Sequence, residues 1–184
     1  MQILLKNAWY IAAWDYKITR ELQQITALGE IVCVFRPKAG ELVGLEDAYP
    51  HRKMPLSMGR IKGDTVNCGY HGLTFDWAGQ CIWAPGTSQI SSNAHVHAYS
   101  LNEKYGLVRI WMGNPALTDV NDIFETKNYG YLLYGMNSGY AMELNCNYLL
   151  MCDNLLDPTH VAWVHQSSFA IDATKDTPLQ VSSV

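Results

Sequence analysis

The sequence predicts a chain that is mainly β with some α, of the α+β class, and three observations support this fold class. Between residues 30 and 112, short apolar runs alternate with turn signals, as in a small antiparallel β domain. The run Gly113-Asn114-Pro115 is a strong turn signal that closes this domain. After Phe124 the pattern changes, and leucines take a helix-like spacing.

The strands expected in the β domain are short apolar runs bounded by glycine and proline. Turn residues at 37–40, 62–64 and 76–79 separate several of these runs, because glycine and proline favour conformations that end a strand. The expected strands are residues 31–35, 42–45, 65–68, 73–75, 81–84 and 107–112. Short strands at this spacing predict one β domain over residues 1–115, followed by a linker at 116–123.

The remaining residues, 124–184, are expected to begin a second domain that contains helix. Within them, residues 148–165 have an apolar spacing typical of a helix, set by Leu149, Leu150, Leu155 and Leu156. Pro158 does not fit inside an unbroken helix, because its ring removes a hydrogen bond and clashes with the preceding turn. We therefore expect Pro158 to begin a new turn that is capped by Asp157.

Composition excludes several classes of protein. The chain has 184 residues, is 48% hydrophobic and carries a formal net charge of -4, with both signs interspersed. The sequence has no stripe of basic residues of the kind that binds nucleic acid. It also has no run that approaches the ~20 apolar residues of a membrane helix. Lys6 and Asp15 interrupt the apolar start, which argues against a signal peptide and predicts a cytoplasmic protein. Five cysteines, an odd number, argue against a disulfide framework and leave metal binding open.

Two short motifs in the β domain offer ligands for an iron–sulfur cluster. Cys68-Gly69-Tyr70-His71 pairs a thiolate with an imidazole, and Tyr49-Pro50-His51 lies upstream. A Rieske 2Fe-2S cluster is held by two cysteines on one iron and two histidines on the other. Two loops, each with one cysteine and one histidine, would meet this requirement.

The residues around these motifs closely resemble the Rieske domain of aromatic-ring and aryl O-demethylating oxygenases. The resemblance rests on residues 45–52 (LEDAYPHR), 55–57 (PLS) and 68–76 (CGYHGLTFD), and residues 7–10 (NAWY) resemble the vanillate and dicamba demethylase group. It implies a Rieske-type β-sandwich domain followed by an incomplete α+β catalytic domain. It also implies an oxygenase component that passes electrons from a Rieske cluster to mononuclear Fe(II) and acts with O2 on a small aromatic compound, by mono- or dioxygenation.

This chain departs from the family at one cluster ligand. The resemblance assigns the cluster to His51, Cys68 and His71, but Tyr49 occupies the position of the fourth ligand, normally a cysteine. A phenol is a hard oxygen donor with a pKa near ~10, whereas iron–sulfur clusters require thiolate. We therefore expect the cluster to be partial or absent. Cys81 is the nearest substitute in sequence, but a small core residue is the favoured interpretation of it.

A second motif, Asp157-x-x-His160 followed by His165, resembles the family's mononuclear-iron segment. Side chains five residues apart on an ideal helix point roughly 140° apart, so we expect His165 to lie where the helix ends or bends. Two histidines and one carboxylate form the facial triad that holds Fe(II). The resemblance implies that His160 and His165 bind the iron, and that Asp157 links it to His71 of a neighbouring subunit. The third ligand is expected beyond residue 184, because Asp172 and Asp176 do not match its place in the pattern.

The resemblance also implies partners, and two other functions remain open. The expected partners are a reductase component of the flavin or ferredoxin type and further copies of this chain, most simply in a trimer. One alternative is a Rieske ferredoxin-like electron carrier, against which the second motif argues. The other is a non-catalytic partial gene product, so it is uncertain whether the chain alone is an enzyme. Trp83 is expected near the cluster site, and Cys146 and Cys152 are expected to be core thiols.

Overall fold

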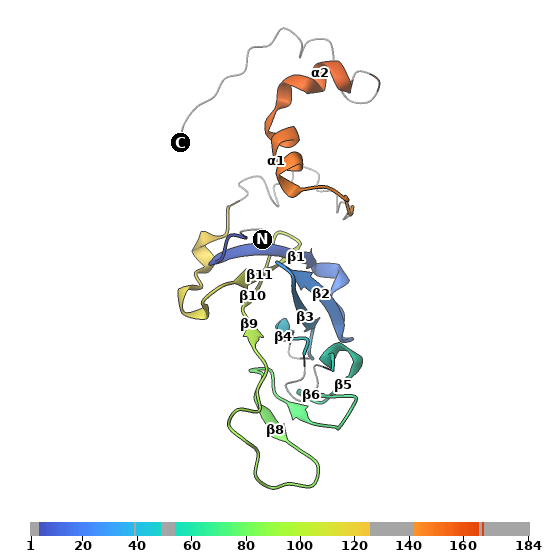
Figure 1. Cartoon of the computed structure of the whole chain (residues 1–184), viewed down its shortest axis with the longest axis vertical. Coiled ribbons are helices and arrows are strands. Elements are labelled where there is room, and N and C mark those ends of the chain that lie inside the picture. The colour runs from blue at the N-terminus through green and yellow to red at the C-terminus, as the bar shows by residue number, and fades with distance from the viewer. Residues whose placement is uncertain (1–3, 39, 49–53, 126–141, 166, 168–184) are drawn as a thin grey trace. The chain divides into compact units, whose positions relative to one another are not determined.

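The computed structural model describes residues 4–38, 40–48, 54–125, 142–165 and 167. The chain divides into two compact units, Met1–Ser138 and Gly139–Val184. All the strands found in the described residues belong to the first unit, and the two α-helices found there belong to the second (Figure 1).

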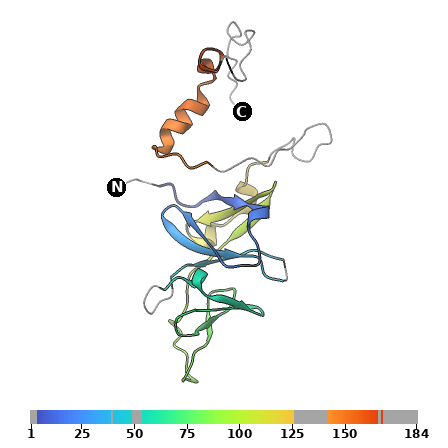
Figure 2. The same ribbon diagram turned by 90° about the vertical axis from the view of Figure 1, so that its right-hand side faces the viewer.

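The first unit contains three antiparallel sheets. The first has the order β1 (Ala8–Trp14), β11 (Leu107–Met112) and β10 (Leu101–Lys104). The second has the order β2 (Gln23–Ala27), β3 (Glu30–Phe35), β4 (Val43–Glu46) and β9 (Ala98–Tyr99). The third has the order β5 (Arg60–Lys62), β6 (Thr65–Asn67), β7 (Thr74–Phe75) and β8 (Cys81–Trp83). Figures 1 and 2 show the second sheet between the other two.

Alternate residues of a strand point to opposite faces of a sheet, and strand β3 of the second sheet has buried residues on both faces. Val32 and Val34 of β3 belong to one apolar core, which they share with Val108 and Ile110 of β11. Cys33 and Phe35, which alternate with these valines in β3, belong to a second core. That core joins the second sheet to the third, through Cys33, Phe35, Leu45, Val66, Phe75 and Cys81. The sandwich therefore has three layers and two cores, with β3 contributing to both.

The structure confirms every strand expected from the apolar runs, with ends that differ by at most one residue. It adds strands that the sequence pattern did not indicate, namely β1, β2, β5, β9 and β10. The expected turns are also present, including the left-handed glycines Gly63 and Gly79 at the β5–β6 and β7–β8 connections.

The segment expected to be a linker is folded onto the β domain. It contains the 3-10 helices Pro115–Leu117 and Val120–Asp122, whose first turns are capped by side chains of the preceding Asn114 and Asp119. The indole Nε1 of Trp9 in β1 donates a hydrogen bond of 2.7 Å to the carbonyl of Asp119. Ile123 is buried. Residues 116–123 therefore extend the first unit and are not a loose connection.

The second unit contains two helices separated by a turn. Helix α1 (Tyr148–Leu156) begins after Asn147, whose side chain accepts a hydrogen bond from the Leu149 amide, and α2 (Val161–Val164) follows the 3-10 turn Pro158–His160. Pro158 is the first residue of this turn and Asp157 caps it, as expected. The expectation that Cys146 and Cys152 are core thiols was wrong, because both are exposed and α1 has no buried residue. No helix in the described part of the chain is both long and apolar enough to cross a membrane.

Candidate metal centres

The Cys68–His71 motif forms a tight turn between β6 and β7. The Cys68 amide donates to the Leu73 carbonyl at 2.8 Å, and the Gly72 amide donates to the Cys68 carbonyl at 3.1 Å. Gly72 has φ +74°, a left-handed conformation that glycine adopts without a steric penalty. The turn leaves Cys68 buried and His71 exposed, with the His71 ring edge-on to Tyr70 at 4.1 Å between centroids. The two donors therefore sit on one hydrogen-bonded turn, with the Cys68 thiol buried and the His71 ring exposed.

The segment that follows the first motif packs directly on this turn. A Cβ atom placed on Gly69 would lie 2.8 Å from the Met58 carbonyl oxygen, and one on Gly59 would lie 2.2 Å from the Asn67 carbonyl oxygen. The backbones are too close for any side chain at these two glycines. Tyr49 and His51 themselves lie outside the described residues, so their position beside Cys68 and His71 stays a prediction.

Trp83 and Pro85 border the same turn. A Cβ atom placed on Gly72 would lie 3.8 Å from Cζ3 of Trp83 and 3.9 Å from Cγ of Pro85. The Trp83 side chain is half-exposed, so its ring extends the surface beside the His71 turn. This position agrees with the expectation that Trp83 lies near the cluster site.

The structure places Cys81 in the apolar core, as the favoured interpretation expected. Its Sγ donates a 3.4 Å hydrogen bond to the Trp83 carbonyl, and burial raises the pKa of its thiol. Burial, reinforced by the charge of Asp47, raises the pKa of Cys33 to about 12. Both residues therefore favour the protonated thiol, whereas metal binding requires the thiolate.

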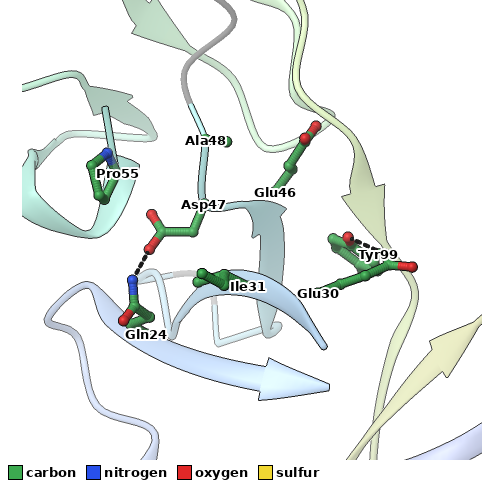
Figure 3. A pocket seen from close by; sticks show the side chains of 8 residues that line it. All are labelled: Gln24, Glu30, Ile31, Glu46, Asp47, Ala48, Pro55 and Tyr99. Carbon is green, nitrogen blue, oxygen red and sulfur yellow. Dashed lines mark hydrogen bonds between the residues drawn. The ribbon is translucent and has the colours of Figure 1, made fainter. Parts of the chain in front are cut away.

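Asp47, which sequence reasoning missed, lies at the start of the first ligand loop. Its side chain is buried and accepts hydrogen bonds from Gln24 and from both the amide and the hydroxyl of Ser57. It lines a surface pocket of about 420 Å³, shown in Figure 3, with Glu30, Glu46 and Tyr99 on another side. Tyr99 donates a 2.8 Å hydrogen bond to Glu30, and burial together with this bond raises the pKa of Tyr99. An isolated aspartate gives no pattern, which is why the sequence did not indicate its role.

In the second unit, the turn between α1 and α2 brings His160 and His165 together. Their ring centroids are 5.5 Å apart with an interplanar angle of 61°. His165 caps the C-terminal end of α2 with φ -103° and ψ 22°, so the helix ends there as expected. Nδ1 of His160 lies 2.5 Å from the Asp157 carbonyl oxygen, so Nε2 is the ring nitrogen that would bind a metal.

The spacing of the two rings fits one shared metal ion. Imidazoles that bind one ion through nitrogens at roughly 2.1 Å have centroids roughly 4.5–6.5 Å apart, depending on the angle at the metal. Oδ1 of Asp157 accepts hydrogen bonds from the hydroxyl and, at 2.9 Å, the amide of Thr159, and these bonds lower the pKa of Asp157. Within the described residues, no three His, Cys, Asp or Glu side chains are arranged to hold a metal ion.

Comparison with known proteins identifies the β domain. Residues 8–100 match the model of the Rieske [2Fe-2S] domain. The chain belongs to the Rieske family. Residues 144–184 of this Rieske protein match the vanillate O-demethylase oxygenase C-terminal domain, which begins just before α1.

The proteins similar to this chain include components of oxygenase systems. The iron–sulfur subunit TsaM1 of the toluene-4-sulfonate monooxygenase system of Comamonas testosteroni is 41% identical over 172 residues, which cover 93% of this chain and 49% of that protein. The oxygenase component of dicamba O-demethylase of Stenotrophomonas maltophilia is 34% identical over 92% of this chain and 50% of its own length. A crystal structure of dicamba monooxygenase bound to dicamba superposes on 91% of this chain and 50% of that one, with a TM-score of 0.83 and 34% identity. This Rieske chain spans about half the length of the relatives it matches.

Proposed function

We propose that this chain forms the Rieske domain and the start of the catalytic domain of an oxygenase component that acts on a small aromatic compound. The observation that carries the proposal is the His160–His165 pair, held at 5.5 Å in a segment separate from the Cys68–His71 turn. An electron carrier requires only the ligands of the cluster, whereas an oxygenase also requires a separate site for a mononuclear iron. The relatives named above, which belong to oxygenase systems, support the same function.

The donors around the cluster position do not fit an intact 2Fe-2S centre. Cys68 and His71 lie on a turn suited to ligation, and His51 would supply a second imidazole, but Tyr49 supplies a phenol in place of a thiolate. The other described thiols of the domain, Cys33 and Cys81, lie in the same apolar core as Cys68 but outside the Cys68–His71 turn. We therefore infer that the cluster is incomplete or absent in this chain and that electron supply to the second iron is impaired.

In the second unit, His160 and His165 would hold the mononuclear iron, which supplies a site for O2 when a third ligand completes it. The contact between Nδ1 of His160 and the Asp157 carbonyl fixes the orientation of the first ring. The Asp157 carboxylate is exposed beside this pair. We propose that it links the iron to His71 of a second copy, in a trimer served by a separate reductase of the flavin or ferredoxin type.

The substitution Tyr49→Cys tests whether the lack of a thiolate at position 49 prevents an intact cluster, and Tyr49→Phe is the matched control. Iron and acid-labile sulfide are measured per chain after anaerobic reconstitution, together with the electron paramagnetic resonance spectrum of the reduced protein. We expect far less than two irons and two sulfides in the parent and in Tyr49→Phe, and a rise toward that content in Tyr49→Cys. A full complement with a normal Rieske signal in the parent would overturn the inference.

A further inference from the structure

The strongest polar contact near the ligand loops is made by Asp47. This residue directly follows β4, and its side chain is only 4% exposed. Oδ1 accepts a 2.7 Å hydrogen bond from the Ser57 amide. Oδ2 accepts bonds of 2.7 Å from the Ser57 hydroxyl and from Nε2 of Gln24, the second of which is drawn in Figure 3. A buried carboxylate is costly without partners, and three donors at this distance satisfy it.

The positions of these partners in the chain explain what the Asp47 side chain holds together. Residues 49–53, with Tyr49 and His51, lie between Asp47 and Ser57, so the carboxylate ties together the two ends of the first ligand loop. Gln24 belongs to β2 of the second sheet, and the amide of Asp47 donates at 3.0 Å to the Ile31 carbonyl of β3. Both ends of the loop are therefore anchored to the middle layer of the domain.

The same contact extends to the second ligand loop. Ser57 lies in the 3-10 turn Leu56–Met58, and the Met58 carbonyl faces Gly69 at a distance that excludes a side chain. Gly69 lies between the ligands Cys68 and His71. A continuous set of contacts thus runs from Asp47 through Ser57 and Met58 to the Cys68–His71 turn.

We propose that Asp47 is a positioning residue, which holds the Ser57–Met58 turn against the second sheet and through it supports the Cys68–His71 turn. The inference rests on the proposed function, because it takes residues 49–51 and 68–71 to be the ligand loops. It assigns no ligand role to Asp47 itself.

The positioning role is tested first without any metal, by hydrogen exchange with mass spectrometry on the full chain. Asp47→Asn keeps the size of the side chain but removes its charge and one acceptor, and Ser57→Ala removes one donor only. Hydrogen bonds to charged groups are among the strongest in proteins, so exchange in peptides covering 48–58 should quicken at least roughly tenfold in Asp47→Asn and less in Ser57→Ala. The matched control is Asp76→Asn, whose carboxylate accepts from the amides of Ala78 and Gln80 at the β7–β8 turn. Unchanged exchange at 48–58 in both variants would overturn the proposal.

The second test places Asp47→Asn and Ser57→Ala in the Tyr49→Cys background. We expect at least roughly tenfold faster loss of the cluster to a chelator in Asp47→Asn, with a broadened or shifted Rieske signal, while Asp76→Asn matches the Tyr49→Cys parent. If Tyr49→Cys alone fails to load iron, the proposed function fails. If it loads iron and Asp47→Asn retains it with an unchanged signal, the positioning role fails. Should Asp47→Asn unfold by far-ultraviolet circular dichroism, Ser57→Ala and Gln24→Ala decide the same question.

Discussion

At the scale of single residues, burial decides which thiols of this chain are reactive. Cys33, Cys68 and Cys81 are buried in the β domain, whereas Cys146 and Cys152 are exposed in the second unit. The pKa of Cys33 is raised from 9.0 to about 12, so the folded state favours its protonated thiol. This contribution to stability is present below about pH 9 and is lost as the pH rises toward 12.

We therefore predict selective alkylation. With iodoacetamide at pH 8, Cys146 and Cys152 should react first, and Cys33 should stay unmodified because it is buried and its raised pKa favours the protonated thiol. Peptide mass spectrometry of the native and the denatured chain measures the modified fraction at each site. Rapid alkylation of native Cys33 would contradict its burial, and the double variant Cys146→Ser/Cys152→Ser should remove the fast phase.

The sequence identified single residues where a motif fixes their chemistry. The sequence placed Cys68 and His71 on one loop, which the structure forms as a tight turn. It also expected Pro158 to begin a new turn, and that turn brings His160 and His165 together. Cys152 was predicted wrongly, because leucine spacing predicts a helix but does not say what covers it. Asp47 was missed because its role depends on Gln24 and Ser57, which are distant in sequence or lack a recognisable pattern.

At the scale of secondary structure, β3 is the strand on which both cores depend. Its alternate side chains enter two different cores, and only its first residues, Glu30 and Ile31, lie outside them. Loss of a large side chain from this strand should therefore weaken the whole β domain rather than one layer of it.

We predict that Phe35→Ala lowers the free energy of unfolding of the β domain by about 3–5 kcal/mol, the usual cost of emptying a buried aromatic site. Ile31→Ala in the same strand is the control, and it should cost at most about 1 kcal/mol because Ile31 is exposed. Urea unfolding followed by tryptophan fluorescence compares them. Equal losses in the two variants would show that β3 is not the shared element.

The strands that the sequence did not indicate share one property, which is their place at the edge of a sheet. β1 and β10 flank β11, β2 and β9 border the second sheet, and β5 borders the third. An edge strand is held by hydrogen bonds to one neighbour and needs no strong apolar pattern of its own, as in residues 23–27 and 101–104. This reason does not apply to β1, whose residues Ala8–Trp14 are apolar, and the edge strand β8 was expected from its apolar run. Interior strands such as β3 and β6 carry the apolar runs that sequence analysis detects.

At the scale of the whole molecule, the second unit exposes many large apolar side chains. They include Leu149, Leu150, Leu155, Leu156, Trp163 and Val164. Exposed apolar patches of this kind favour association with another surface. They are consistent with the proposed assembly of several copies, and they offer a direct way to test it.

We predict that the chain is an oligomer, most simply a trimer of the 20.7 kDa chain, when light scattering is measured on a sizing column. Leu155→Lys/Leu156→Lys should shift the population toward monomer, because a charge on each contact side chain opposes burial. Leu5→Lys, an exposed position in the first unit, is the matched control and should leave the mass unchanged. A monomeric parent would contradict the prediction. A dimer would support self-association but would contradict the trimer.

The close approach of backbone at Gly59 and Gly69 has a consequence for how such a protein changes over generations. At these two glycines the contact involves main-chain atoms of Met58 and Asn67, so this part of the fold does not depend on the side chain of any ligand. Tyrosine and cysteine codons differ by a single nucleotide. One point mutation at position 49 therefore separates a thiolate from a phenol.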